Sequence, residues 1–512
     1  MPEAVKPDVA VHLESLTRKR LVRPEVPLDE EAYRFDHVLI RDTTYQSLLK
    51  RARATLHERL VEWARDRSTE DDEILGYHLE QAHGYLAELG PLDDHGRDLG
   101  VRGAQKLEAS GRRAFVRGDM PAAANLLRRA VALRAPEDRE RHRLMPLVAE
   151  ALMEIGEFAW AETLLDEAVT YAGDDPRLLA NVELTRLFVQ HRVTEDLSGW
   201  CSDVLAVTDR TIPVLERMHA HEELARAWRL LVYVHGIALH YGRQAEASER
   251  AVVHARAAGD HRLEARLTAG YTIAICEGPT PVPEAIEICR GVLARNPAER
   301  QGEAITRCSL ASLLAMASRI DEARVEYAAA RELLVDLGGA LPAYASIAAA
   351  GVELLAGNAE DVARDLRVVY GDLGRLGERF FRPLVGALLA EALQRSGDTA
   401  GGMAQVAEVA EQADASDVET WALLESARAS GLASAGEPTA AVDAARRAVD
   451  LLADTDAPVA QAHALVRLGE TLAAAGRPVE ARRELETARH LYERKGNVAA
   501  AGLLSDTAAQ LA

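Results

Sequence analysis

The sequence predicts an all-α, right-handed solenoid of stacked helix hairpins, preceded by a short segment that carries the expected strands. Two observations predict the solenoid: a turn signal that recurs every 38 to 40 residues over most of the chain, and small residues at fixed distances from that signal. Self-similarity at such a period is the signature of a repeat architecture. The turn residues are Gly118, Gly156, Gly242, Thr280, Ser318, Gly357, Gly397, Gly436 and Gly476.

Three columns of small residues flank these turns. Five residues after each turn stand Ala123, Ala161, Ala247, Ala285, Ala323, Val362, Gly402, Ala441 and Ala481. Seven residues before the turn are Gly111, Ala149, Ala311, Ala350, Ala390, Ala429 and Gly469, and twelve after it are Ala130, Ala168, Ala330, Ala448 and Ala488. Two antiparallel helices approach closely where a ridge on one meets a residue too small to hold them apart. The pattern is similar to the tetratricopeptide consensus from Gly103 to Tyr492, with a period longer than the usual ~34 residues.

The regular spacing of the turn residues is interrupted at two places. Gly156 and Gly242 are 86 residues apart, and the intermediate turn expected near His191–Arg192 lacks both glycine and alanine. The second break is a proline-rich turn at 279–283, and because proline lacks a donor and fixes φ, the preceding helix should stop by about Glu277. We expect nine or ten helix pairs over residues 103–512.

Composition sets limits on partners. The formal charge is −21, and residues 1–67 hold 13 Lys/Arg against 12 Asp/Glu, which leaves 47 against 69 for the remainder. The acidity therefore belongs to the repeats and argues against nucleic acid lying along them. The sequence contains no run of 18 apolar residues and no signal-peptide core at its start, which predicts a cytoplasmic protein without membrane contact.

The first hundred residues predict a different organisation. A helix, a strand that starts near residue 20, a second strand at Tyr33 to Asp36 and a long helical stretch make the last part of a winged helix. We expect a partial winged helix over 1–45 and a helical linker over 46–102. The string "FDHVLIRDTTYQSLL" (35–49), followed by "YHLEQAHGYLAELGPLD" (77–93) and "ASGRRAFVRGDMPAAANLLRRAVAL" (109–133), resembles the region after the ATPase core of bacterial signal-transduction ATPases. The closest likeness is to the subset associated with class III adenylate or guanylate cyclases. The resemblance continues into "LVAEALMEIGEFAWAETLLDEAV" (147–169) and covers roughly residues 10–175 closely and the remaining repeats loosely.

The resemblance implies a regulatory, C-terminal part of such a protein and no catalysis. A P-loop needs a lysine after its glycine, and none of the five lysines (Lys6, Lys19, Lys50, Lys106 and Lys495) follows a glycine. A cyclase domain would need strands that the sequence does not predict beyond residue 50. We therefore expect no enzyme activity, no catalytic residues and no cofactor.

Metal binding is not expected either. His78 and His83 are five residues apart and so do not share one helical face. The four cysteines, Cys201, Cys276, Cys289 and Cys308, lack Cys-x-x-Cys spacing and read as structural thiols. Asp-Asp pairs at 71–72, 93–94 and 174–175 fit helix starts, where carboxylates cap free amides.

The sequence thus indicates protein or peptide recognition, as the sensor or regulatory arm of a signalling ATPase or cyclase that is either a partner or an upstream domain. Two other classes stay open: a truncated cyclase or nucleotide-binding ATPase, and the effector-sensing part of an ATPase-type transcriptional activator. In tetratricopeptide geometry the first helix of each pair lines the concave surface. The spacing places these polar candidates there: Arg229, His240, Glu391, Gln394, Arg395, Ser426, Ser430, His463 and Glu470.

Overall fold

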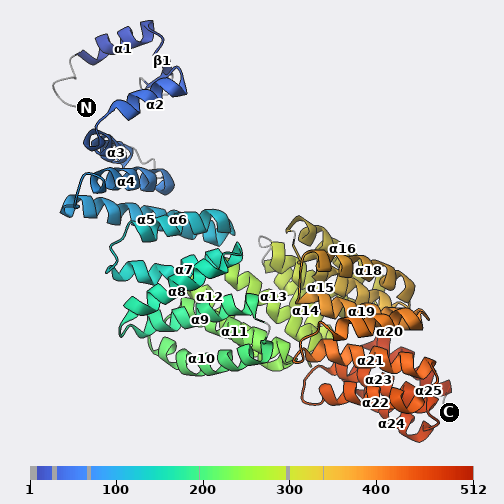
Figure 1. Cartoon of the computed structure of the whole chain (residues 1–512). Coiled ribbons are helices and arrows are strands. Elements are labelled where there is room, and N and C mark those ends of the chain that lie inside the picture. The colour runs from blue at the N-terminus through green and yellow to red at the C-terminus, as the bar shows by residue number, and fades with distance from the viewer. Residues whose placement is uncertain are drawn as a thin grey trace. The chain divides into compact units, whose positions relative to one another are not determined.

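The structure is a computed structural model that describes residues 8–25, 32–65, 71–194, 196–295, 300–337 and 339–510. Within these residues it contains 25 helices and one two-stranded antiparallel sheet (Figure 1). The expectation of an all-α chain with strands confined to residues 20–37 is confirmed. The chain divides into two compact units, Met1–Tyr171 and Ala172–Ala512.

The first unit begins with a helix–hairpin–helix segment. In the hairpin, β1 pairs with β2 in the register Val22↔Phe35. The elements of this unit are α1 (Val9–Arg18), β1 (Val22–Glu25), β2 (Ala32–Phe35), α2 (Val38–Ser47), α3 (Lys50–Arg65), α4 (Asp72–Ala87), α5 (Asp94–Arg117), α6 (Met120–Ala132), α7 (Arg139–Glu154) and α8 (Phe158–Ala172). The carboxylates of Asp71 and Asp93 accept backbone N–H groups at the starts of α4 and α5, so the expected capping by these Asp-Asp pairs is confirmed.

The second unit consists of helix pairs followed by one last helix. Its helices are α9 (Pro176–Val193), α10 (Leu197–Arg217), α11 (His221–Ile237), α12 (Tyr241–Ala257), α13 (His261–Glu277), α14 (Val282–Arg295), α15 (Arg300–Met316), α16 (Ile320–Leu337), α17 (Pro342–Leu355), α18 (Ala359–Arg375), α19 (Phe381–Arg395), α20 (Thr399–Ala410), α21 (Val418–Ser434), α22 (Pro438–Leu451), α23 (Pro458–Ala474), α24 (Pro478–Lys495) and α25 (Val498–Gln510). Together with α5–α8, the described residues hold ten pairs from α5 to α24, within the expected number. The fold is a tetratricopeptide-like solenoid.

The turn residues were predicted well, with one displacement. Gly118, Gly156, Gly357, Gly397, Gly436 and Gly476 adopt positive φ, and so does Ser318. In each case the second helix begins two residues later. The turn predicted at Gly242 was misplaced. The residue with positive φ is Leu239 (+53°), three residues earlier, and α12 already begins at Tyr241. Ala247 is therefore not the fifth residue after its turn.

The two irregular regions had mixed outcomes. The turn expected near His191–Arg192 exists but lies slightly later, because α9 continues to Val193, its C-cap is Thr194 and α10 begins at Leu197. At the proline-rich turn α13 ends at Glu277, as predicted. Residue 103, where we expected the repeats to begin, lies inside α5, so the helix pair that contains it begins at Asp94. The expected segment 1–45 lies partly outside the described residues, at 1–7 and 26–31.

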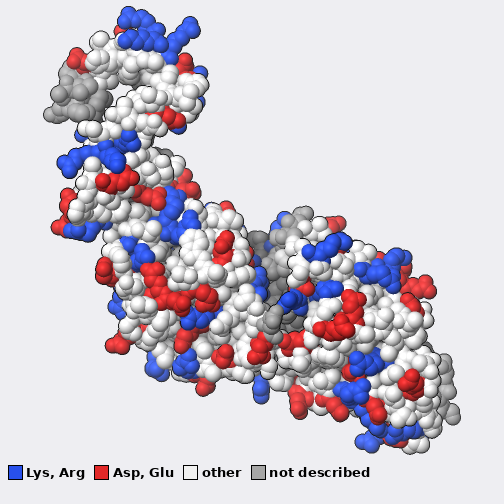
Figure 2. Space-filling view, in the orientation of Figure 1, with Lys and Arg blue, Asp and Glu red and all other residues white. Residues whose placement is uncertain are grey.

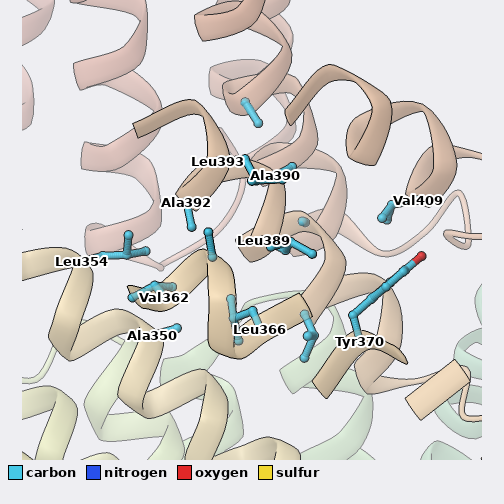
Figure 3. Close-up of a cluster of buried hydrophobic side chains, with 14 of the residues drawn as sticks. Ala350, Leu354, Val362, Leu366, Tyr370, Leu389, Ala390, Ala392, Leu393 and Val409 are labelled. Atoms are coloured by element: carbon cyan, nitrogen blue, oxygen red, sulfur yellow. The ribbon is translucent and has the colours of Figure 1, made fainter. Parts of the chain in front are cut away.

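The small-residue columns are buried at helix crossings. Ala123, Ala285 and Ala441 are fully buried. A Cβ added to Gly111 would lie 2.7 Å from Leu127 Cγ, which shows how closely α5 and α6 approach. Larger residues fill the space between successive pairs, as in the core formed by α17 to α20 (Figure 3). Its members include Ala350, Leu354, Val362, Leu366, Tyr370, Leu389, Ala390, Ala392, Leu393 and Val409.

The turn glycines give a direct test of the repeat boundaries. Gly436 has φ +81°, and an added Cβ there would meet no atom within 4 Å. Gly436→Val should therefore lower the free energy of unfolding through backbone strain alone, by ~1 kcal/mol or more. The matched control is Gly371→Val, at an exposed position inside α18 where an added Cβ also meets open space. Urea unfolding of both variants measures the effect, and equal midpoints would mean that Gly436 does not need its left-handed conformation.

Candidate functional site

In the second unit the first helices of the pairs form an inner layer. Each first helix packs on the next one along the chain, from α9 through α11, α13, α15, α17, α19 and α21 to α23. Second helices pack mainly on their own partner and on the following first helix. Successive first helices therefore contact one another more than successive second helices do, as expected for the concave side of a solenoid.

The second unit also closes on itself. The backbone N–H of Gly242, at the start of α12, donates to Asp456 Oδ2 (2.8 Å), which precedes α23. The ammonium of Lys495, at the end of α24, donates to the carbonyls of Ile275, Gly278 and Thr280 at 2.7–2.8 Å. Both contacts join a helix pair to one that lies about five pairs further along the chain. Parts of this unit that are more than 200 residues apart in the sequence are therefore in direct contact.

A polar cluster links α19 to α23 on this inner layer. Arg467 donates through Nη2 to Glu391 Oε1 (2.8 Å) and through Nη1 to Glu470 Oε2 (2.6 Å). His463 Nε2 lies 3.3 Å from Glu391 Oε1. We call Glu391, His463, Arg467 and Glu470 the α19–α23 cluster.

Burial and charge oppose each other at Glu391, whose side chain is 2% exposed. Burial alone would raise the pKa of this carboxyl, but Arg467, His463 and Arg395 hold it well below its usual range. Glu391 Oε2 and Arg467 Nε find no partner among the described residues. The Glu391–Arg467 pair is thus ionised and buried, and some of its hydrogen-bonding atoms have no partner. His463 and Glu470 remain 28% and 40% exposed.

An aromatic group occupies the inner layer nearer the start of the unit. The guanidinium of Arg229 (α11) lies 4.7 Å from the ring centroid of Phe188 (α9) and 5.6 Å from that of Tyr233. The ring of His191 stacks on Tyr233, with centroids 5.3 Å apart. Burial raises the pKa of Tyr344 on α17, and Tyr233 adds to this shift.

The sequence-predicted candidates fall into three groups. Glu391, His463 and Glu470 meet in the α19–α23 cluster, and the positive charge of Arg395 acts on Glu391. Arg229 belongs to the aromatic group. The other four lie elsewhere, and their positions follow.

Those four candidates serve contacts within the protein. Gln394 lies over Gly402 on α20 and Gly431 on α21, where added Cβ atoms would come within 2.6 and 2.8 Å of its Nε2. His240 lies next to the contact that closes the second unit, with its Nε2 3.1 Å from the carbonyl oxygen of Asp454. Ser426 is buried, and its carbonyl accepts a hydrogen bond from the hydroxyl of Ser430.

The sequence prediction missed Arg467. This residue lies four residues after His463 on the same helical face, and that spacing could have identified it.

A third group of ionisable residues lies where α12, α13 and α21 meet. Glu277 ends α13 and Glu419 lies in the first turn of α21. Burial raises the pKa of Glu419 to about 8, and the charges of Glu277 and Asp417 add to the effect. Burial also raises the pKa of Glu277, although Lys495 partly opposes it.

This shift makes a prediction about pH. In the unfolded chain Glu419 titrates near 4.5, whereas in the folded chain it keeps its proton up to about 8. Its contribution to stability is therefore complete below pH 4.5 and is lost as the pH rises towards 8. Glu419→Gln cannot titrate, so its melting temperature relative to wild type should be higher at pH 8.5 than at pH 5. Glu287→Gln, on a side chain that is 73% exposed, is the control. The same difference at both pH values would contradict the assignment.

Other classes of site are not prominent in the described residues. No group of three or more His, Cys, Asp and Glu side chains there is placed to hold a metal ion. Across the same ranges, no helix has the length and apolar character needed to cross a membrane. The four cysteines are unpaired, and burial raises the pKa of Cys289 and Cys308 to about 12. Figure 2 shows basic and acidic side chains interspersed over the visible face.

Comparisons with known proteins find likeness only among solved structures. No family model and no curated protein matches the chain. The Cut9–Hcn1 hetero-tetramer of APC/C is 13% identical with a TM-score of 0.49, over 91% of this chain and 88% of that one. A Rap protein complexed with competence and sporulation factor is 11% identical with a TM-score of 0.49, over 69% and 99%. The apo quorum sensor NprR from B. thuringiensis is 11% identical with a TM-score of 0.41, over 76% and 98%. Likenesses this distant do not say what this chain binds.

Proposed function

We propose that this chain is a protein- or peptide-binding scaffold whose inner layer holds a segment of a partner. The observation that carries the proposal is the placement of Arg, Tyr, His and Glu side chains on an inner layer that is otherwise built from Ala, Leu and Val. Arginine and aromatic residues dominate the binding energy of protein interfaces. Here they are half-buried and held in place by the protein, as with Arg229 between Phe188 and Tyr233.

The chemistry of the exposed groups fits a polypeptide better than a uniformly charged ligand. His463 can donate or accept a hydrogen bond, the free face of Glu470 accepts, and Arg395 donates. A peptide backbone presents donors and acceptors in alternation, so one extended segment can satisfy all three groups. The buried Glu391–Arg467 ion pair keeps α19 and α23 in register beneath them.

Selection from a random peptide library displayed on phage tests this function. We expect the immobilised chain to enrich a consensus, and the selected peptides to lose about tenfold or more in affinity for Arg229→Ala and His463→Ala. The control is Arg364→Ala on α18, a second helix, where the side chain is 68% exposed. Lack of any consensus, or equal losses in the control variant, would speak against the inner layer as a binding surface.

We further propose that the scaffold is the regulatory arm of a bacterial signalling ATPase or cyclase and works in the cytoplasm. The support is the resemblance over roughly residues 10–175 together with exposed apolar side chains in the first unit. Phe35, Val38 and Leu39 are 38%, 52% and 65% exposed, as expected for a segment that lacks its covering helices, although Val22 is buried. Unpaired thiols agree with a reducing compartment.

Hydrogen exchange on the purified monomer tests this part. We expect residues 10–25 and 32–40 to exchange faster than α19 and α21, because few apolar contacts cover them. Addition of an ATPase encoded next to this chain should protect them. Protection equal to that of α19 in the isolated monomer would show that the segment is complete without a partner.

A further inference from the structure

Three polar side chains of the inner layer keep hydrogen-bonding atoms without partners. Glu391 Oε2, both polar atoms of the Gln394 amide and Arg467 Nε are buried and make no hydrogen bond to any described residue. Buried polar atoms usually have a partner, because an unpaired one costs free energy. Glu391 and Gln394 stand three residues apart on α19, where side chains are neighbours, and Arg467 contacts Glu391 from α23. The unpartnered atoms therefore belong to one part of the inner layer.

The ion pair between Glu391 and Arg467 uses only one of two available hydrogen bonds. A guanidinium can hold a carboxylate with two parallel N–H groups, and Nε and Nη2 form one such fork. Here Nη2 donates to Glu391 Oε1 at 2.8 Å, while Nε and Oε2 are unpaired within the described part of the chain. Nη1 is engaged elsewhere, because it donates to Glu470. The second arm of the fork thus offers a donor and an acceptor, and the Glu391 side chain that carries the acceptor is only 2% exposed.

Gln394 adds another donor and another acceptor. Its amide lies against two other helices, since a Cβ added to Gly402 on α20 or to Gly431 on α21 would come within 2.6 or 2.8 Å of Nε2. The two glycines make room for the side chain, yet neither end of the amide is hydrogen-bonded to a residue that the structure describes. A methionine would fill the same space without unpaired polar atoms, which indicates that the amide serves binding and not folding.

The unpartnered atoms select a class of ligand. Arg467 Nε and Gln394 Nε2 are donors, whereas Glu391 Oε2 and Gln394 Oε1 are acceptors. A primary carboxamide carries two N–H groups and an oxygen with two lone pairs, so it can satisfy donors and acceptors together. A carboxylate brings only acceptors, and an ammonium or guanidinium brings only donors, so each leaves half of the atoms unpaired. A backbone peptide group has a single N–H and satisfies only one of the two acceptors.

We propose that Glu391, Gln394 and Arg467 bind the side-chain carboxamide of an asparagine or glutamine in the partner segment. The proposal rests on the peptide-binding function and adds a specificity to it. His463 and Glu470 contact the ion pair and are 28% and 40% exposed. These two side chains reach the solvent, and the carboxamide approaches the pair from their side.

The experiment begins with peptides selected by the full-length chain. We expect the consensus to contain asparagine or glutamine. Replacement of that residue by its apolar isostere, leucine for asparagine or methionine for glutamine, should weaken binding at least about tenfold. Replacement by the corresponding acid should weaken it by at least as much, because a carboxylate has no donor for Glu391.

Variants of the chain assign the effect to this site. Gln394→Met and Arg467→Lys should weaken the carboxamide peptide about tenfold and leave the apolar isostere unchanged. Arg467→Lys keeps the positive charge beside Glu391 but has no Nε–H donor. The matched control is Gln405→Met on α20, a second helix, where Nε2 is likewise buried without a partner among the described residues. The control variant should bind both peptides as wild type does.

The melting temperature distinguishes a binding role of Gln394 from a structural one. Because its amide is not hydrogen-bonded within the described residues, Gln394→Met should melt at the wild-type temperature or above it. A melting temperature several degrees lower would show that the fold itself uses the amide, and would overturn the assignment.

The outcomes separate this site from the wider function. A consensus without asparagine or glutamine, or equal losses for both peptides in Gln394→Met, would overturn the carboxamide site while peptide binding stands. A water molecule has the same donors and acceptors as a carboxamide. Full affinity of Gln394→Met for the carboxamide peptide would therefore leave water as the only occupant.

A small probe tests the site without a peptide. Acetamide should shift the NMR signals of the Gln394 side-chain NH₂ group, which are assigned by their loss in Gln394→Met, whereas acetate and ethylammonium should not. Absence of any peptide consensus together with this shift would overturn the peptide as the source of the carboxamide. Absence of the shift would overturn the site itself.

Discussion

Lys495→Met is expected to lower the free energy of unfolding by about 3–5 kcal/mol, because it leaves two buried carbonyls and one part-buried carbonyl without a donor. In the wild type, Lys495 as a residue is 1% exposed, and its ammonium donates to the carbonyls of Ile275, Gly278 and Thr280. These carbonyls lie at the end of α13 and in the proline-rich turn, where the helix itself supplies no donors. Methionine keeps most of the side-chain volume, so the loss reports the hydrogen bonds.

The position of the contact predicts where the structure loosens. Residue 495 is 215 to 220 residues away from its three partners, so its loss should open the closure rather than a single repeat. Hydrogen exchange should increase at residues 275–285 and in α25, which packs on α15. The matched control is Arg489→Met on the same helix, where the side chain is 45% exposed. A change in Lys495→Met no larger than in the control would show that the closure does not depend on this ammonium.

The part of the fold that could be predicted is the part that depends on local spacing. A turn with positive φ and a small residue at the helix crossing are both needed within a single hairpin. Every repeat therefore shows the same residue pattern in its own sequence. Ser318 was placed correctly without a glycine, since the residues around it kept the spacing. The register at Thr280 also held, because α14 begins two residues later as in the other pairs, although prolines replace the usual turn.

The misplaced Gly242 shows where this logic fails. An added Cβ at this residue would come within 3.0 Å of Asp456 Oδ2, and its N–H donates to the same carboxylate. The glycine is therefore explained by a close approach from more than 200 residues away, whereas Leu239 takes the strained turn conformation. Leu239 is 2% exposed and belongs to the same buried apolar cluster as Ala457, and this burial compensates for its positive φ. A local pattern cannot distinguish a glycine required by its turn from one required by a distant neighbour.

For the candidate site, the sequence predicted the type of polar residues better than it predicted which residues contact one another. Three of the nine predicted residues converge in the α19–α23 cluster because spacing along a helix fixes which face a residue occupies. Its central residue, Arg467, was missed, since the ion pair to Glu391 spans 76 residues and two helix pairs. Gln394, which the spacing also assigned to the concave surface, lies close to glycines of α20 and α21, where Gly402 replaces the usual alanine.

Removal of one partner from the α19–α23 cluster should be nearly as destabilising as the loss of Lys495. Glu391→Ala leaves Arg467, 14% exposed, with only the half-exposed Glu470 as a counter-charge. Breaking a buried ion pair from one side typically costs about 3–5 kcal/mol, because a buried charge remains uncompensated. Glu391→Leu combined with Arg467→Met removes both charges and should recover most of the loss. Urea unfolding of the single and double variants measures both effects, and a double variant no more stable than Glu391→Ala would contradict the buried-charge explanation.

The dependence of stability on acidic pH provides an independent test of the Glu391–Arg467 ion pair. The pKa of Glu391 lies well below its usual range in the folded chain, so the folded state keeps this carboxylate ionised at pH values where the unfolded state binds a proton. Its contribution to stability is present above pH 4.5 and is lost progressively as the pH falls below that value. Wild type should therefore lose more stability between pH 5 and pH 3 than the double variant, in which neither residue titrates. Parallel pH profiles for the two proteins would mean that Glu391 is not held ionised by Arg467, and the ion pair could then not be what fixes α19 against α23.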